Sequence, residues 1–313
     1  MNSRRYLGAG SETALLFCLL ALAWGTSFVA IEVGLHHVPP LLFAGLRYVI
    51  AGAVLLAVAL VTADRRVPRT RDEWLHVGVV ATLVIGAYHG FLYLGEQHVP
   101  GAVAAVVISL TPVLTAPLAS ALLPDDSIGL VECAGLAFGV AGVAVIALPG
   151  SGVGSTSVLG VLFVFCGALS FALGSVASRP LDAGLPIQTT QAWAMLLGAG
   201  GLLIVGVLRG ESLAGVAWNA TSIGSLLYLS LVAGAGGYLL YFVLLDRASP
   251  TEINLVGYAE PAVATLVTWI ALGHVVEETT LVGFAAILLG FALLKRRALL
   301  SVARATTRAA QGA

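Results

Sequence analysis

Three ionisable side chains lie inside long apolar segments of the sequence, and they are its first candidates for chemistry. Glu260, Arg47 and His89 are each flanked on both sides by mostly hydrophobic residues. An ionisable group costs free energy when it is placed in hydrocarbon, so each of these positions is a candidate for substrate binding or ion coupling. A carboxylate suits a cation or a proton, whereas a guanidinium suits a carboxylate.

Glu260 is the most distinctive of the three because Pro261 follows it. A proline cannot donate a backbone hydrogen bond, and it frees the carbonyl of Gly257 four residues earlier. A carboxylate beside a loosened helix is typical of a cation or proton site, although Glu260 could instead satisfy a neighbouring helix and only position the kink. The corresponding pair in the first half of the chain is Thr111 and Pro112, so the charge is present only once.

Arg47 and His89 each allow two interpretations. Arg47 lies about six residues, or about 9 Å of helix, into its span, so it could hold a substrate carboxylate in a bidentate contact. That depth is also short enough for its guanidinium to reach the headgroups, and we favour this structural role. His89 could relay a proton or serve as a buried neutral hydrogen-bonding group.

Aromatic residues recur at helical spacing around these positions. Tyr88 and His89 share one helix face with Tyr93 and Glu96, and a comparable stripe contains Tyr238 and Tyr241. Aromatic walls with a few polar groups suit a metabolite site, but tyrosines also collect at membrane interfaces. Tyr88 and Tyr238 lie deeper than Tyr93 and Glu96, which could mark the outer boundary. Further candidates, each of which could instead pack, are Trp24, Gln191, Trp193, Asn254 and Tyr258.

Two of the candidates on one segment conflict. Glu260 lies 200° around the helix from Tyr258 at 100° per residue, whereas Asn254 and Tyr258 share a side. One narrow cavity cannot be lined by both sets unless the kink at Pro261 rotates one of them.

The composition indicates that these residues lie in a membrane protein. Of the 313 residues, 59% are hydrophobic and only 10% are charged, against about 25% charged in an average soluble domain. Too few charged groups remain to cover a water-soluble surface, which excludes a soluble enzyme, a nucleic-acid-binding protein and a disordered chain. The three cysteines lie in apolar runs and are interpreted as small hydrophobic residues. No metal or cofactor motif is present.

Ten apolar runs are long enough to cross a bilayer core of about 30 Å. The loops between them are short, so the sequence predicts one all-α membrane unit of ten transmembrane helices. The predicted spans lie near 12–32, 41–62, 75–95, 101–122, 127–148, 157–177, 189–208, 222–244, 252–272 and 279–295.

The distribution of basic residues predicts the orientation. With the N-terminus in the cytoplasm, 13 of the 15 Arg and Lys residues fall on the cytoplasmic side, Arg209 falls outside and Arg47 lies within a span. The positive-inside rule therefore predicts that both termini are cytoplasmic. Arg4 and Arg5 before an apolar run also resemble a cleavable signal peptide, but the run continues to Ile31, which favours a retained span.

The two halves of the chain are similar in register. A shift of 150 residues pairs Tyr88 with Tyr238 and Glu96 with Asp246, and shifts of 149, 148 and 147 align the remaining spans in order. Five spans per repeat is an odd number, which predicts two inverted repeats at 1–150 and 151–313, the second followed by a basic cytoplasmic tail. Inverted repeats with a site near the midplane are the usual construction of secondary transporters.

Several motifs occur in order along both halves. They are Trp-Gly-Thr-Ser-Phe at 24–28, the segment 43–47, Ser-Leu-Thr-Pro-Val at 109–113 and Tyr-Ala-Glu-Pro-Ala-Val at 258–263. With these motifs the chain resembles the EamA-type members of the drug/metabolite transporter superfamily over nearly its whole length. The family often has Leu-Gly-Glu at the ends of the fourth and ninth spans, whereas here Leu-Pro-Asp and Leu-Gly-His occupy 123–125 and 272–274.

The resemblance implies a carrier in the cytoplasmic membrane that exports a small polar metabolite, with an amino acid as one candidate. Facilitated diffusion or uptake by the same fold remains an alternative, as does a lipid scramblase or a non-transporting scaffold. The sequence has neither His-Glu-x-x-His nor Gly-x-Ser-x-Gly, which argues against an intramembrane enzyme. Membrane lipids and a small-molecule substrate are the expected partners. Glycine-rich faces at 135–142 and 283–290 could mediate internal packing or a homodimer.

Overall fold

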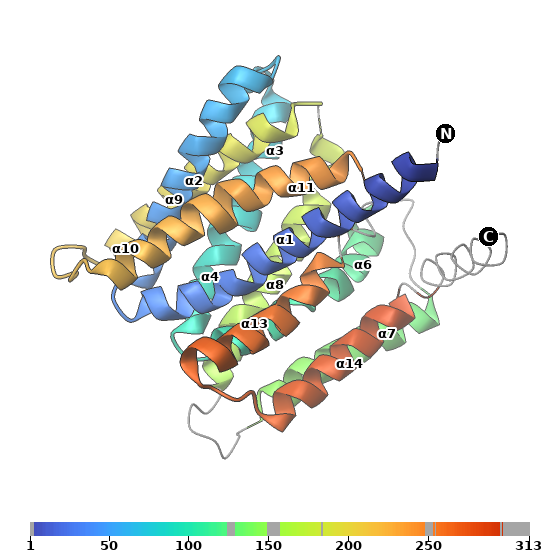
Figure 1. Cartoon of the computed structure of the whole chain (residues 1–313). Helices are drawn as coiled ribbons and strands as arrows, with labels where there is room; N and C mark the ends of the chain where they lie inside the picture. Colours follow the sequence, from blue (N-terminus) through green and yellow to red (C-terminus); the bar gives the residue numbers. More distant parts are fainter. Residues whose placement is uncertain are drawn as a thin grey trace.

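The structure is a computed structural model, and it describes residues 3–123, 129–148, 157–182, 184–247, 253, 255–294 and 296. This part of the chain is helical and contains no β-strand. Figure 1 shows the helices packed side by side in one bundle. Asn254 and the basic tail beyond Arg296 lie outside the described residues.

The described part of the first half forms eight helical segments. They are α1 (Ser3–Leu35), α2 (Pro40–Thr62), α3 (Arg71–Val79), η1 (Val80–Ala87), α4 (Tyr88–Glu96), α5 (Gly101–Ile108), α6 (Thr111–Leu122) and α7 (Leu130–Ile146). Helix α8 (Val158–Ala177) opens the second half. The second half continues with η2 (Arg179–Leu181), α9 (Ile187–Leu208), α10 (Ala220–Leu227), η3 (Tyr228–Gly236), α11 (Gly237–Leu245), α13 (Val256–Leu272) and α14 (Glu278–Leu294).

Among the described residues, seven helical stretches are long and apolar enough to cross a membrane. Three shorter apolar helices, Cys133–Ile146, Val256–Leu272 and Glu278–Leu294, lie where the fifth, ninth and tenth spans were predicted. The surface of the bundle exposes many large hydrophobic side chains, such as Ile204 and Ile270. Such a surface is suited to lipid rather than water.

Prolines and capping residues set where the helices begin. Pro39, Pro100 and Pro186 directly precede α2, α5 and α9, with extended backbone that cannot continue a helix backwards. Thr70 and Asn219 cap α3 and α10, each in a reciprocal capping box with the residue three positions later. These local signals explain why the predicted boundaries are close to the observed ones.

The third and eighth predicted spans each contain a π-helical segment. η1 covers Val80–Ala87 and η3 covers Tyr228–Gly236, so the two lie at matching positions in the two halves of the chain. A π segment inserts extra residues into the turn and leaves carbonyls free for other donors. Ser170 Oγ on α8 donates to the Leu83 carbonyl at 2.8 Å, and Trp24 Nε1 on α1 donates to the Ala233 carbonyl at 3.0 Å.

Each half also holds the beginning of a helix in the other half. Glu211, in the connection after α9, accepts hydrogen bonds from the amides of Leu41 and Leu42 at 3.0 Å, at the start of α2. In the opposite arrangement, Thr189 Oγ1 near the start of α9 donates to the Arg65 carbonyl at 2.6 Å, in the connection after α2. These two helices also pack against each other along their length.

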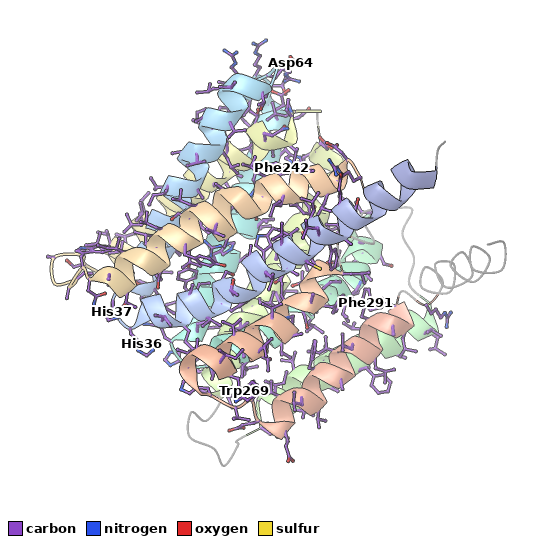
Figure 2. The ribbon with its side chains drawn as sticks, in the orientation of Figure 1. His36, His37, Asp64, Phe242, Trp269 and Phe291 are labelled. Carbon is purple, nitrogen blue, oxygen red and sulfur yellow. The ribbon has the colours of Figure 1, made fainter. Side chains whose placement is uncertain are left out.

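Figure 2 marks the two ends of the bundle. His36 and His37 follow α1 at one end, and Asp64 follows α2 at the other. We call these the His37 end, with the connections 36–39, 97–100, 209–219 and 273–277, and the Asp64 end, with 63–70 and 178–186.

Helices α7 and α14 form a closely packed pair at one edge of the bundle (Figure 1). A Cβ atom added to Gly142 would lie 2.6 Å from the carbonyl oxygen of Gly283, and one added to Gly135 would lie 2.6 Å from that of Gly290. Only glycine allows this approach at both positions. The glycine faces therefore serve internal packing between these two helices.

Candidate functional site

Trp24 joins α1 to the eighth predicted span. Besides the hydrogen bond to Ala233, its ring lies 5.7 Å from that of Tyr238 and 5.8 Å from that of Tyr241. The two tyrosine rings are themselves 6.4 Å apart and T-shaped. Gln191 on α9 is buried next to Tyr238. The structure thus brings four of the predicted residues together from α1, α9 and α11.

Tyr88 and His89 begin α4, directly after the π segment of the first half. The Tyr88 ring contacts the rings of His89 at 4.2 Å and Phe171 at 5.1 Å. His89 Nδ1 lies 3.0 Å from the Ile85 carbonyl, and its Nε2 lies 2.5 Å from the Tyr48 hydroxyl. Because a carbonyl can only accept, Nδ1 carries the proton, and the neutral ring accepts from Tyr48 at Nε2. Both nitrogens of His89 are therefore occupied.

Arg47 is held deep in the bundle, and the expectation that it reaches the headgroups is wrong. Only 4% of the residue is exposed. Nε donates to the Leu229 carbonyl in η3 and Nη1 donates to the Tyr93 hydroxyl on α4, both at 3.2 Å. The guanidinium also lies 4.9 Å from the ring centre of Tyr48. Within the described chain, no carboxylate forms an ion pair with it.

Glu260 and Tyr258 lie on opposite sides of α13. Tyr258 packs against Phe291 of α14 with ring centres 4.2 Å apart, and its buried hydroxyl has no hydrogen-bond partner in the part of the chain that the structure describes. Glu260 instead interacts electrostatically with Tyr88 and Tyr238. The carboxylate therefore belongs with the central tyrosines, and Tyr258 belongs with the packing of α14.

The remaining predicted residues make other contacts. Thr111 Oγ1 donates to the Ile108 carbonyl at 2.7 Å, where α5 ends and α6 begins, and Pro112 follows it. Pro261 is buried inside α13. Trp193 lies near the Asp64 end, where Nε1 donates to the Arg66 carbonyl at 3.0 Å.

Sequence reasoning missed Tyr48, which connects Arg47 with His89. The available signal was a tyrosine beside an arginine within an apolar span, because a hydroxyl in that setting needs a partner. We call Tyr48 and the predicted residues grouped around it and around Tyr238 the central site. They are Trp24, Arg47, Tyr48, Tyr88, His89, Gln191, Tyr238, Tyr241 and Glu260.

A helical bundle with lipid-suited surfaces and buried polar side chains defines an integral membrane protein. The chain belongs to the EamA-like transporter family, which matches it at residues 12–148 and again at 158–296. The family and the named relatives are transporters and not enzymes.

Curated relatives cover most of the chain. It is 30% identical over 287 residues to the uncharacterised transporter YvbV of Bacillus subtilis, covering 92% of each chain. It is 29% identical over 277 residues to the uncharacterised inner membrane transporter YedA of Escherichia coli K12, covering 84% of this chain and 88% of YedA. A probable terminal-alkyne amino-acid exporter of Streptantibioticus cattleyicolor is 30% identical over 291 residues, with 92% and 95% covered.

A solved crystal structure has the same fold. It matches with a TM-score of 0.64 at 24% sequence identity and covers 92% of this chain and 98% of its own. This likeness concerns the arrangement of helices alone.

Proposed function

We propose that the protein is a secondary transporter that exports a small polar metabolite, with amino acids as the first candidates. One observation carries the proposal: Trp24 in the first half lies against Tyr238 and Tyr241 in the second, and Arg47 in the first half donates to the Leu229 carbonyl in the second. A site between the two halves, with aromatic walls and both signs of charge, suits a small polar molecule with an amine and a carboxylate.

The proposed architecture is ten spans in two inverted five-helix repeats, at 1–150 and 151–313. The matching π segments support it, as do the reciprocal contacts between the halves. The opposite half donates a hydrogen bond to each of the two π-segment carbonyls, Leu83 and Ala233. It also bonds to the residues at the starts of α2 and α9. Such a pair of repeats can rock about a central site and open it to each side in turn.

The proposed orientation puts both termini and the Asp64 end in the cytoplasm. Arg65, Arg66, Arg69 and Arg71 lie at or beside that end, whereas the opposite His37 end has Arg209. This asymmetry agrees with the positive-inside rule. The His37 end then faces outward.

Glu260 is proposed as the coupling residue. It is followed by Pro261 within α13, where a loosened backbone lets the helix bend. Pro112 at the start of α6 provides the matching bend in the first half. Proton binding at Glu260 would favour one orientation of α13 over the other.

The first experiment is a thermal-shift screen of the full-length protein in detergent against amino acids, nucleobases, polyamines and aromatic cations. Binding to the folded state alone raises the melting temperature. A compound that does so is then loaded into proteoliposomes to measure export. We expect an amino acid to stabilise the protein and Glu260→Gln to abolish the pH dependence of its transport between about pH 5 and 9. Unchanged transport and pH dependence in Glu260→Gln would remove the coupling role.

A lipid scramblase is the second candidate, favoured by an apolar hollow on the outside of the bundle. It has a volume of about 430 Å³ and lies between α1 and the η3–α11 segment, where Leu19, Val232 and Val243 are exposed. Fluorescent phospholipid exchange in liposomes separates the two functions. Lipid exchange without amino-acid export would replace the proposed carrier.

A further inference from the structure

Glu96 is a buried carboxyl group that the central site does not use. It is the last residue of α4, at the His37 end, and only 5% of it is exposed. Both of its carboxyl oxygens are buried, and neither has a hydrogen-bond partner among the described residues. Buried polar groups in membrane proteins are normally satisfied, so an unpartnered carboxyl requires an explanation.

A second carboxyl group, that of Glu32 on α1, interacts electrostatically with Glu96 and makes two contacts of its own. Its Oε2 accepts a hydrogen bond from the Gly101 amide at 2.8 Å, at the start of α5. Its Oε1 lies 3.7 Å from Nδ1 of His274, which follows α13. Glu32 thus ties α1 to α5 and to the segment after α13, and so holds the His37 end together.

The charged and titratable groups around Glu96 come from three helices. Glu32 faces it from α1, Arg47 from α2, and Tyr88 and Tyr93 lie on α4 itself. Among the described residues, η1 and α5 have no titratable side chain, and α8 contributes only Cys166, which is exposed. Arg47 is already bonded to Leu229 and Tyr93.

We propose that Glu96 is a proton-binding site that keeps the His37 end closed. An ionised Glu96 would be an unpaired charge in an apolar surrounding, beside a second carboxylate, and this arrangement is costly. The closed bundle therefore holds Glu96 in its protonated form. Loss of that proton to water places two carboxylates against each other, and their repulsion separates α4 from α1. The Glu32 contacts to Gly101 and His274 break as these helices part.

The proposal is tested by measuring the opening of the His37 end against pH. Cys18, Cys133 and Cys166 are replaced by serine, and spin labels are placed on His37→Cys, after α1, and on the exposed Gln97→Cys, after α4, in the full chain in nanodiscs. We expect the ratio of molecules with a long distance between the labels to molecules with a short distance to rise with pH. Because one proton is released, this ratio can rise by at most about tenfold per pH unit. In Glu96→Gln, which is neutral at every pH, the short distance should dominate throughout.

Glu211→Gln is the matched control. Glu211 is also a carboxylate at the His37 end, but its oxygen is already bonded to the amides of Leu41 and Leu42. This variant should keep the pH response of the parent. The proposal is overturned if the labelled parent shows one distance at all pH values, or if Glu96→Gln responds to pH as the parent does.

Thermal unfolding provides a second measurement that does not depend on the labels. Because glutamine has the shape of a protonated glutamic acid, Glu96→Gln should melt at the parent's temperature at low pH. As the pH rises, the parent should lose more stability than the variant, since the parent alone must give up the proton. Equal losses in both proteins would contradict the proposal. Neither measurement requires a transported substrate, so both can fail while the carrier function stands.

Discussion

The carbonyl groups of Leu83 and Ala233, 150 residues apart, each accept a side-chain hydrogen bond from the other half of the chain. Ser170 on α8 donates to Leu83 and Trp24 on α1 donates to Ala233. Both carbonyls lie in π segments, where the backbone ladder leaves acceptors free. A hydrocarbon environment offers no water to satisfy them. These two bonds therefore fix the first helix of each half against the third span of the other.

Replacement of Trp24 by phenylalanine tests this role. The variant keeps ring contacts with Tyr238 and Tyr241 but removes the donor to Ala233. We expect the free energy of unfolding to fall by about 1–2 kcal/mol, because a buried carbonyl loses its partner. Trp193→Phe is the control, since its Nε1 bonds to Arg66 in an exposed setting where water can replace it. Stability is measured by thermal unfolding in detergent. Equal losses in the two variants would show that the bond to Ala233 stabilises the fold no more than the exposed bond to Arg66 does.

The helical fold could be predicted because the apolar spans and the helix starts depend on residues that are close together in the sequence. Pro39, Pro100 and Pro186 mark the starts of α2, α5 and α9 in the sequence itself. The π segments could not be predicted, because one extra residue per turn leaves no signature in hydropathy. Their matching positions emerge only from the folded backbone.

The central site could be predicted only in part. The 150-residue shift predicts that Tyr88 and Tyr238 are a related pair, and the 200° between Tyr258 and Glu260 predicts that these two residues lie on different faces of one helix. Which face turns inward depends on the neighbouring helices, and periodicity contains no information about them. Arg47 illustrates the same limit: its depth in the membrane suggested contact with headgroups, whereas acceptors on η3 and α4 hold it inside.

Arg47→Lys should lower both the stability and the transport rate of the protein, although the positive charge is kept. The guanidinium bonds to Leu229 and Tyr93 on two different helices at once, and an ammonium cannot reproduce that planar geometry. We expect a loss of about 1.5–3 kcal/mol in unfolding free energy and at least about a tenfold loss of transport. Arg209→Lys, at the exposed end of α9, provides the control and should behave as the parent. Full activity in Arg47→Lys would mean that the positive charge alone matters.

Gly283→Ala should separate α7 from α14. An added Cβ would lie 2.6 Å from the Gly142 carbonyl oxygen, and backbone cannot yield as a flexible side chain can. Overpacking of this kind costs about 1–3 kcal/mol. Gly201→Ala in α9 meets nothing within 4 Å and should be neutral or slightly stabilising, since alanine favours helix. If both variants melt at the parent's temperature, close approach at Gly283 is not required for folding.

The hydroxyls of Tyr238 and Tyr258 distinguish the central site from helix packing. Tyr238 lies among Trp24, Gln191 and Glu260, so Tyr238→Phe removes a polar group from the proposed substrate site. The half-saturating substrate concentration should rise about threefold to tenfold, which corresponds to one neutral hydrogen bond. The Tyr258 hydroxyl is buried and has no partner within the described ranges, so Tyr258→Phe should leave transport unchanged and preserve or raise the melting temperature. Substrate titrations in proteoliposomes give both values. A larger effect from Tyr258→Phe than from Tyr238→Phe would place the substrate on the α14 side of α13, away from Glu260.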